Sequence, residues 1–224
     1  MVVENRYGKV LKFPVQLLWI SIMSLGLISC ARVSSYPVSL QYIPQQDISD
    51  RDMAPVNAVI GVADFQDNRS FDDKAVVGKR LMSKGEEIDI KCQLKDANHA
   101  VISVIKEFIK RSGYTVGKDI SDWDLNADSL PPECGEFAIG GSIEELQIVC
   151  QGGLFREKYE VKVRLSIVFA DVQQKRILYQ STLESSSQLK NIRFSQENVQ
   201  EELNNVLSSV VEKILDIDII NQAL

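Results

Sequence analysis

Two segments of the chain carry the hydrophobic spacing of an amphipathic α-helix. The first spans Asp96 to Arg111, and its apolar residues recur at the i, i+3, i+4 and i+7 positions: Ala97, Ala100, Val101, Val104, Ile105, Phe108 and Ile109. Lys110 and Arg111 fall in the last turn, where positive charge interacts favourably with the helix dipole. The second segment begins at Ser195, a preferred N-cap residue, and continues with Val199, Leu203, Val206, Leu207, Val210, Val211, Ile214 and Leu215. We therefore expect two helices, each with one buried stripe.

Alternation of apolar and polar residues predicts the strands. From Tyr159 to Phe169 every odd position is apolar, whereas the even positions hold Glu160, Lys162, Arg164, Ser166 and Val168. Period two over this length is typical of a strand with one buried face. A return strand follows at 176–186, and shorter runs at 57–65 and 137–149 predict two more. The segment 81–95 is ambiguous, with a small strand at 86–91 as one interpretation. Short links between the last three strands favour antiparallel pairing.

The predicted order β-α-β-β-β-α indicates an α+β fold. Two amphipathic helices need a common apolar surface, and one face of a sheet supplies it. We expect a two-layer sandwich, with a four-stranded, mainly antiparallel sheet and both helices on one face. The polar even-numbered side chains then lie on the other face, which is either solvated or a partner surface.

The first thirty residues have the parts of a secretory signal. Arg6, Lys9 and Lys12 precede an apolar run from Phe13 to Leu27. At about 15 residues this run is shorter than the roughly 20 that a membrane-spanning helix needs. The following Leu27-Ile28-Ser29-Cys30 resembles the lipobox of bacterial lipoproteins, in which the cysteine is acylated and the peptide bond before it is cut. An ordinary signal with an incidental cysteine is the alternative.

The lipobox divides the chain into three parts. Residues 1–29 are the expected signal peptide, residues 30–55 a lipidated tether and residues 56–224 a single periplasmic α+β domain. The tether is rich in Ser, Pro, Gln and Asp and has no sustained period, although Tyr36–Ile43 could instead dock as an edge strand. In Gram-negative lipoproteins an Asp after the cysteine usually retains the protein at the inner membrane. Ala31 at that position implies the periplasmic face of the outer membrane.

Composition and charge exclude several functions. The 224 residues hold 25 Lys and Arg against 31 Asp and Glu, a net charge of -6, with no basic cluster for nucleic acid. The single histidine, His99, lies in the first turn of the first predicted helix, where an exposed or capping role is expected. No Gly-x-Ser-x-Gly motif or phosphate-binding loop occurs, and Asp64, Asp67, Asp72 and Asp73 lack the spacing of a calcium loop. We expect no enzymatic activity, no catalytic residue, no cofactor and no metal site.

Three cysteines remain after acylation of Cys30. In an oxidising periplasm two of Cys92, Cys134 and Cys150 should pair. Cys134 and Cys150 would lie at opposite ends of one predicted strand, too far apart to bridge. In a β-α-β crossover the start of the helix, near Cys92, lies beside the end of the following strand, near Cys150. We predict Cys92–Cys150, with Cys92–Cys134 and no disulfide as the alternatives.

Several of these features together resemble the YajG family of bacterial lipoproteins. They are the lipobox, the helix end Ile109-Lys-Arg-Ser-Gly-Tyr-Thr-Val116, the long alternating strand and the closing Phe194-Ser-Gln-Glu-Asn-Val-Gln-Glu-Glu-Leu-Asn-Asn-Val-Leu207. The likeness covers roughly Val56 to Asp216, and the architecture is also similar to the LptE and PqiC auxiliary lipoproteins. The family implies no enzymatic activity and no catalytic residues. The chain departs from it in three extra cysteines and a long acidic loop, Lys118–Cys134.

The sequence therefore favours a non-enzymatic, outer-membrane-anchored lipoprotein with a binding or accessory role in the cell envelope. Its expected partners are the membrane, through Cys30, and an envelope protein, peptidoglycan or lipid. An accessory subunit of a lipid or LPS transport complex is the second hypothesis, and it would be favoured by an exposed apolar groove. An envelope hydrolase is the third, and a pocket joining the Asp cluster to His99 would favour it.

Overall fold

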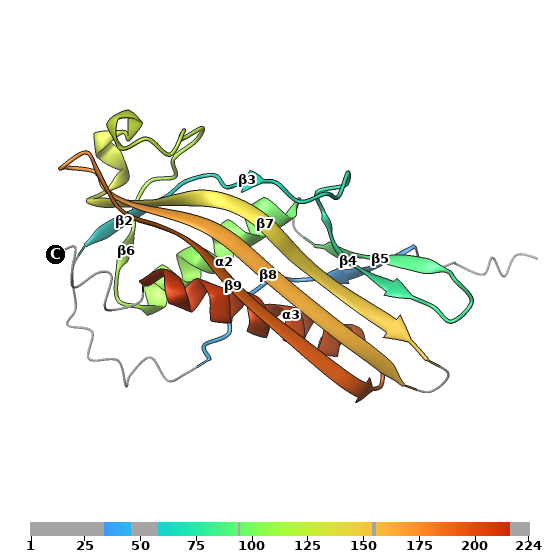
Figure 1. Cartoon of the computed structure of the whole chain (residues 1–224). Helices are drawn as coiled ribbons and strands as arrows, with labels where there is room; N and C mark the ends of the chain where they lie inside the picture. The colour runs from blue at the N-terminus through green and yellow to red at the C-terminus, as the bar shows by residue number, and fades with distance from the viewer. Residues whose placement is uncertain (1–33, 46–57, 94, 154–155, 216–224) are drawn as a thin grey trace, which may run out of the picture. The chain divides into compact units, whose positions relative to one another are not determined.

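Three long strands form one side of a mixed sheet. They are β7 (Phe137–Gly152), β8 (Glu157–Asp171) and β9 (Arg176–Ile192), and each pairs antiparallel with the next. The computed structural model describes residues 34–45, 58–93, 95–153 and 156–215 (Figure 1). In the alternating part of β8 the odd-numbered residues from Tyr159 to Ile167 are almost fully buried, as the period of two predicts.

Three short strands line one edge of β7. The strands β2 (Val59–Val62), β3 (Gln66–Asp67) and β4 (Val76–Leu81) all run parallel to β7 and follow one another along it. The remaining strands extend this side of the sheet: β5 (Glu87–Cys92) pairs antiparallel with β4, β1 (Ser35–Val38) parallel with β5, and β6 (Thr115–Val116) parallel with β2. The described residues thus form a nine-stranded sheet.

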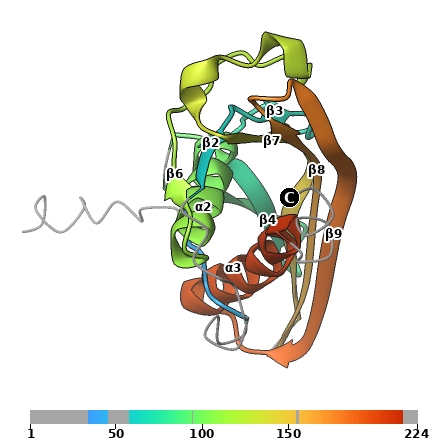
Figure 2. The ribbon, with the colours of Figure 1, turned by 90° about the vertical axis from the view of Figure 1, so that its left-hand side faces the viewer.

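Two α-helices cover one face of this sheet (Figure 2). Helix α2 (Ala97–Arg111) begins after Asp96, whose carboxylate accepts the backbone N–H of His99 at 2.9 Å. Helix α3 (Gln196–Val211) begins after Ser195, whose hydroxyl accepts the N–H of Asn198 at 3.1 Å, and the 3-10 turn η5 (Glu212–Leu215) continues it. The buried stripes of both helices share one apolar core with β7 and β8.

A second, smaller apolar cluster lies on the opposite face of the sheet. The chain between β6 and β7 carries two short turns, η3 (Ala127–Ser129) and η4 (Pro132–Cys134), and its Trp123 is 94% buried against the sheet. A Cβ atom at Gly140 would lie only 2.5 Å from the Trp123 ring. The absence of a side chain at Gly140 is therefore what lets the indole lie on β7. The Lys118–Cys134 loop is packed at this point rather than free on the surface.

The predicted four-stranded, mainly antiparallel sheet is wrong. The structure has a nine-stranded mixed sheet, because short strands of two to six residues pair on one side of β7. Strands of this length carry too few alternating positions to be recognised by period, and a parallel partner far along the chain leaves no hairpin signature. The β-α-β-β-β-α order missed β3, β4 and β6. It also left out β1 and β5, which correspond to the strands offered as alternative interpretations of Tyr36–Ile43 and 86–91.

The boundary predicted between tether and domain also differs. Ser34 and the residues after it belong to the folded unit, and Ser35–Val38 form the edge strand that was the alternative interpretation. The side chains of Val38, Leu40 and Tyr42 lie in the main core, with exposed fractions of 6% or less.

Candidate functional site

The segment Ser35–Gln45, here named the strap, is fixed along helix α3 by hydrogen bonds from its backbone. Gln200 Oε1 accepts the N–H of Ser39 at 2.8 Å, and Asn204 Oδ1 accepts that of Gln41 at 3.0 Å. Further along, Ser208 Oγ accepts the N–H of Ile43 at 2.9 Å, and Glu212 Oε1 accepts that of Gln45 at 2.9 Å. The strap therefore lies along α3 in the same direction as the helix.

The two spacings match, which explains why the contact repeats. The acceptors on the helix lie four positions apart, and the donors on the strap lie two positions apart. Four helical residues rise about 6.0 Å, and two extended residues rise about 6.6 Å. Because the alternate strap side chains point into the core, the strap is held by apolar burial on one side and by a polar ladder on the other.

A cluster around the half-buried Arg80 ties the beginning of the strap to the sheet. The guanidinium of Arg80 on β4 donates from Nε (3.0 Å) and Nη2 (2.6 Å) to Glu157 Oε1 on β8, and from Nη1 to the hydroxyl of Tyr36 on β1 at 2.8 Å. Its carbon Cζ lies 3.6 Å from the centre of the Phe194 ring, which is a close cation–π contact. Residues from β1, β4, β8 and the start of α3 thus meet at one charge pair.

A buried arginine, Arg69, holds the loop between β3 and β4. Arg69 makes two hydrogen bonds to the carboxylate of Asp67, at 2.7 and 2.9 Å, and donates to the carbonyl oxygen of Val76 at 2.7 Å. Burial alone would raise the pKa of the Asp67 carboxyl, but the hydrogen bonds and charge of Arg69 outweigh it and lower the pKa. The loop is therefore clamped onto β3 and β4.

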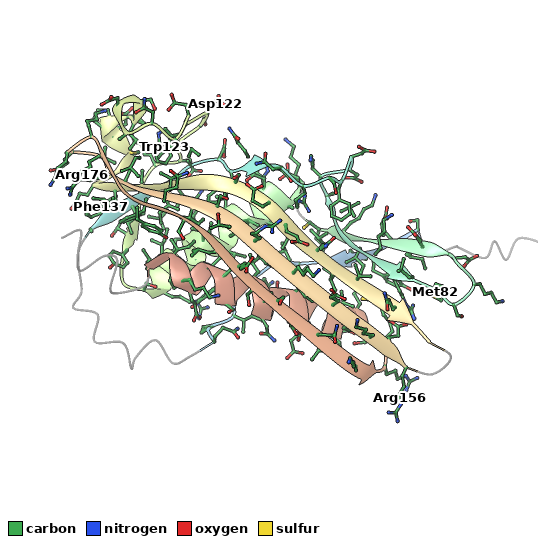
Figure 3. The ribbon with its side chains drawn as sticks, viewed as in Figure 1. Met82, Asp122, Trp123, Phe137, Arg156 and Arg176 are labelled. Atoms are coloured by element: carbon green, nitrogen blue, oxygen red, sulfur yellow. The ribbon has the colours of Figure 1, made fainter. Side chains whose placement is uncertain are left out.

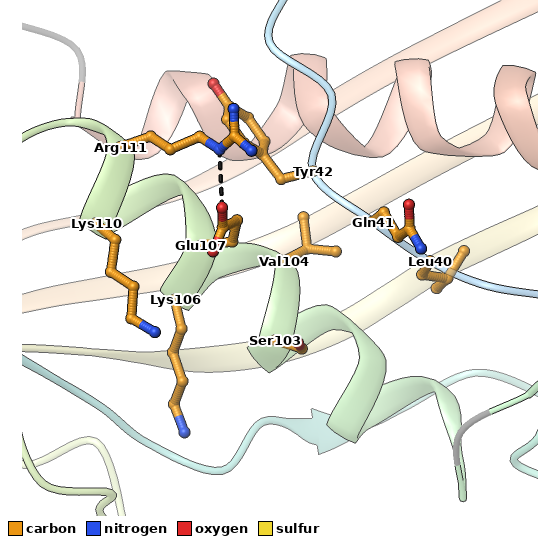
Figure 4. A pocket seen from close by; sticks show the side chains of 9 residues that line it. All are labelled: Leu40, Gln41, Tyr42, Ser103, Val104, Lys106, Glu107, Lys110 and Arg111. Atoms are coloured by element: carbon orange, nitrogen blue, oxygen red, sulfur yellow. Dashed lines mark hydrogen bonds and ion pairs between the residues drawn. The ribbon is translucent and has the colours of Figure 1, made fainter.

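A groove of about 350 Å³ runs between the strap and helix α2 (Figure 4). Its rim carries Lys106, Lys110 and Arg111, with Glu107 the one acid that lines it. Lys106 pairs with Asp119 at 2.6 Å, and Arg111 pairs with Glu107 at 2.8 Å. These cations also lie in the last turns of α2, where they complement the helix dipole. The groove can hold an acidic group, but most of its positive charge is already neutralised.

Two shallow hollows lie on the face of β7–β9 opposite to α3. One, of about 410 Å³, is lined by Glu145, Lys162, Val163, Arg164, Glu184, Ser185 and Ser186. The other, of about 290 Å³, is lined by Asn68, Arg69, Ser70, Phe71, Glu144, Glu145, Leu146, Gln147 and Arg164. They share Arg164 and Glu145, which form an ion pair at 3.7 Å beside an irregularity in the β7–β8 register. This face, here named the open face, carries mainly charged and polar side chains around the two hollows.

Of the three cysteines predicted as site residues, Cys30, Cys92 and Cys150, the structure describes the last two. Cys30 lies outside the described residues. Cys92, Cys134 and Cys150 are buried with free thiols, and burial raises the pKa of Cys92 and of Cys150 to about 12.

The Cys92–Cys150 disulfide predicted from the crossover is not formed in the structure. Cys92 donates its backbone N–H to Ala75, just before β4 begins, whereas Cys150 lies opposite Arg80 near the end of β4. The two cysteines are therefore offset along β4 by the distance from Ala75 to Arg80. At about 3.3 Å per residue this distance is roughly 16 Å, far beyond the Cα separation of a disulfide. The crossover prediction failed because β4 and β5 intervene between the first strand and the helix.

The candidate catalytic groups do not come together. His99 is exposed, as expected, and its ring nitrogen contacts the carboxylate of the N-cap residue Asp96 at 2.7 Å. None of the three hollows contains His99, and within the described ranges no group of His, Cys, Asp and Glu side chains is arranged to hold a metal ion. Across the described part of the chain, no helix has the length and apolar character needed to span a bilayer.

The strap ladder, the buried position of Arg69 and the half-buried position of Arg80 were not predicted from the sequence. The ladder has a visible signal, since Gln196, Gln200, Asn204, Ser208 and Glu212 repeat every fourth residue on one side of the predicted helix. Arg69 and Arg80 carry no such signal, because their burial depends on partners contributed by distant strands.

Comparison with solved structures identifies the fold. Protein XCC0632 from Xanthomonas campestris, of family DUF330, is similar with a TM-score of 0.54 and 10% identity over 84% of this chain and 96% of that one. A neuraminyllactose-binding hemagglutinin homolog from Helicobacter pylori gives a TM-score of 0.46 and 12% identity over 83% and 96% of the two chains. PelC from Paraburkholderia phytofirmans, a dodecamer, gives 0.40 and 14% over 73% and 89%.

The chain therefore shares the fold of the DUF330 protein. No family model and no curated protein matches the sequence.

Proposed function

We propose that this chain is a non-enzymatic, YajG-like envelope lipoprotein, anchored by acylated Cys30 to the periplasmic face of the outer membrane. Its folded unit binds a partner protein through the open face of β7–β9. Anchoring confines this face near a membrane and raises its effective concentration for a partner in the same compartment.

The observation that carries the proposal is the strap. An acyl anchor on Cys30 would hold the folded unit close to the bilayer, because β1 begins at Ser35, five positions after Cys30. The strap is bound at both ends, by the Arg80 cluster and by Glu212. The chain that follows the proposed anchor is therefore attached to both the sheet and α3.

The nature of the hollows favours protein binding over lipid transport. A carrier for acyl chains needs an apolar groove, whereas the hollows of the open face are lined mainly by charged residues and serines. The alternating Lys162, Arg164 and Glu184 side chains offer paired charges of both signs, which suit a polar protein surface.

Two experiments test the proposal. Membrane fractionation of cells that express Cys30→Ala should move the protein from the membrane to the soluble periplasm, while the control Ser34→Ala stays in the membrane. A Cys30→Ala protein that remains membrane-bound contradicts the anchoring.

Photo-crosslinking tests the partner surface. A crosslinker at Lys162 or Ser186, on the open face, should give one discrete envelope protein. The same crosslinker at the exposed Glu197 of α3 should give none. Equal products from both faces contradict the assignment of the open face.

A further inference from the structure

We infer that one end of the folded unit faces the phospholipid bilayer. This end, here named the turn end, carries the β4–β5 turn (Met82–Glu86), Arg156 of the β7–β8 link, and Lys190 and Arg193 at the end of β9. The opposite loop end carries residues 117–136 and the β8–β9 turn (172–175). The inference rests on the proposed acylation of Cys30.

The register of the strands places the first described residues at the turn end. Ser35, the first residue of β1, lies opposite Asp89, close to the beginning of β5. Leu81 at the end of β4 lies opposite Gln151 at the end of β7, so the two turns lie at the same end of the sheet. Figure 3 shows Met82 and Arg156 at this end, and Asp122, Trp123 and Arg176 at the other. The chain therefore enters the fold from the turn end.

The length of chain before β1 limits where the bilayer can lie. Five residue steps separate Cys30 from Ser35, and a fully extended chain spans at most about 3.6 Å per residue, so the reach is roughly 18 Å. The loop end is much further away, because a strand of 17 residues such as β9 extends roughly 56 Å at about 3.3 Å per residue. Acyl chains on Cys30 would thus hold the turn end, and not the loop end, against the lipid.

The charges of the two ends favour the same orientation. Four basic residues, Lys84, Arg156, Lys190 and Arg193, are exposed at the turn end, against the exposed acids Glu86 and Glu87, and Glu87 is paired with Lys79 at 2.7 Å. Six exposed acids lie at the loop end: Asp119, Asp122, Asp124, Asp128, Glu133 and Glu136. They outnumber the exposed Lys118, Lys175 and Arg176 beside them. Anionic headgroups attract basic residues and repel acidic ones over about a Debye length, so the loop end is disfavoured at the bilayer.

The cluster at the base of the strap fixes the point where the described chain enters the fold. Tyr36, the second residue of β1, is bound to Arg80 and packs against Phe194 with the ring centres 4.8 Å apart. Because Arg80 is paired with Glu157 near the β7–β8 link, the start of β1 is held by the strands that form the turn end.

Fluorescence quenching in vesicles tests this inference. Full-length acylated protein would carry one nitrobenzoxadiazole label at Lys84→Cys or Arg156→Cys, with Gln173→Cys in the β8–β9 turn as the matched loop-end position. The native Cys92, Cys134 and Cys150 are buried and would not compete for the label. The protein is reconstituted into phosphatidylethanolamine–phosphatidylglycerol vesicles that contain a headgroup nitroxide lipid. We expect several-fold stronger quenching at Lys84→Cys and Arg156→Cys than at Gln173→Cys.

The outcomes separate this inference from the proposed function. Equal quenching at the two ends, or stronger quenching at Gln173→Cys, in a protein that floats with the vesicles overturns the orientation and leaves the anchoring intact. A protein that carries no acyl chain and does not float overturns both. A twenty-residue Gly-Ser spacer inserted after Ala31 should abolish the difference in quenching between the turn end and the loop end. A difference that persists would show that the short connection between Cys30 and Ser35 is not its cause.

Discussion

Asn204 on helix α3 accepts the backbone N–H of Gln41 at 3.0 Å, although the two residues are 163 positions apart in the sequence. The same side-chain amide donates to the carbonyl oxygen of Ser39 at 3.1 Å. One buried side chain therefore satisfies a donor and an acceptor of the strap. This contact is the middle of the ladder that makes the N-terminal segment part of the folded unit.

Asn204→Ala should lower the free energy of unfolding by about 2 kcal/mol, because it leaves a backbone donor and an acceptor unpaired in a partly buried place. Amide hydrogen exchange at Gln41 should accelerate in the same variant. Asn205→Ala is the control, since Asn205 makes only a long, exposed bond of 3.4 Å to the side chain of Gln45. Equal urea midpoints for the two variants would show that the ladder contributes little.

Gly140→Ala should destabilise the protein by about 1–3 kcal/mol, because the new methyl group overlaps the Trp123 ring and one of the two must move. The emission of Trp123 should shift to longer wavelength as the indole becomes exposed. In a Trp123→Ala background the same change should cost much less, since the obstructing ring is gone. Additive effects in this double-mutant cycle would rule out the clash.

Asp67→Asn should remove about 3 kcal/mol of stability at pH 7, because Arg69 is then buried without its carboxylate. The folded-state pKa of Asp67 is lower than its ordinary value. The stabilisation is therefore fully present above the unfolded value, near 4, and is lost as the pH falls through the lower folded-state value.

The difference in stability between the wild type and Asp67→Asn should accordingly shrink below pH 4. Urea unfolding at pH 7 and pH 3 measures it, with the exposed Asp72→Asn as the control. A difference that does not depend on pH would contradict the role of the Asp67 charge.

The three described thiols should resist alkylation in the native state. With the pKa of Cys92 and Cys150 raised to about 12, only about one part in ten thousand of either is thiolate at pH 8, and both are buried. Iodoacetamide should modify them only after urea is added. A non-reducing peptide map that links Cys92 to Cys150 would instead mean that the pairing of β4 and β5 differs from the one described.

The sequence predicted the parts of the fold that are local. The expected helix at 96–111 is α2 (Ala97–Arg111), and the expected start at Ser195 is the N-cap of α3, because an apolar stripe and a capping residue are both encoded within a few turns. The alternation from Tyr159 to Phe169 likewise identified β8. These signals do not depend on what lies next to each element.

The parts that it missed depend on distant partners. The strands β3 and β4 have meaning only as part of a row along β7, which lies more than fifty residues later in the chain. The strap was interpreted as a tether because its prolines and polar residues resemble a linker. Its order comes from acceptors on α3 about 160 residues away.

Mass spectrometry of the native N-terminal peptide decides whether the anchor exists. We expect the mature chain to begin at Cys30 and this residue to carry a diacylglyceryl group, with or without a third acyl chain on its amino group. A native chain that still begins at Met1, with an unmodified Cys30, would contradict the anchor and the orientation together.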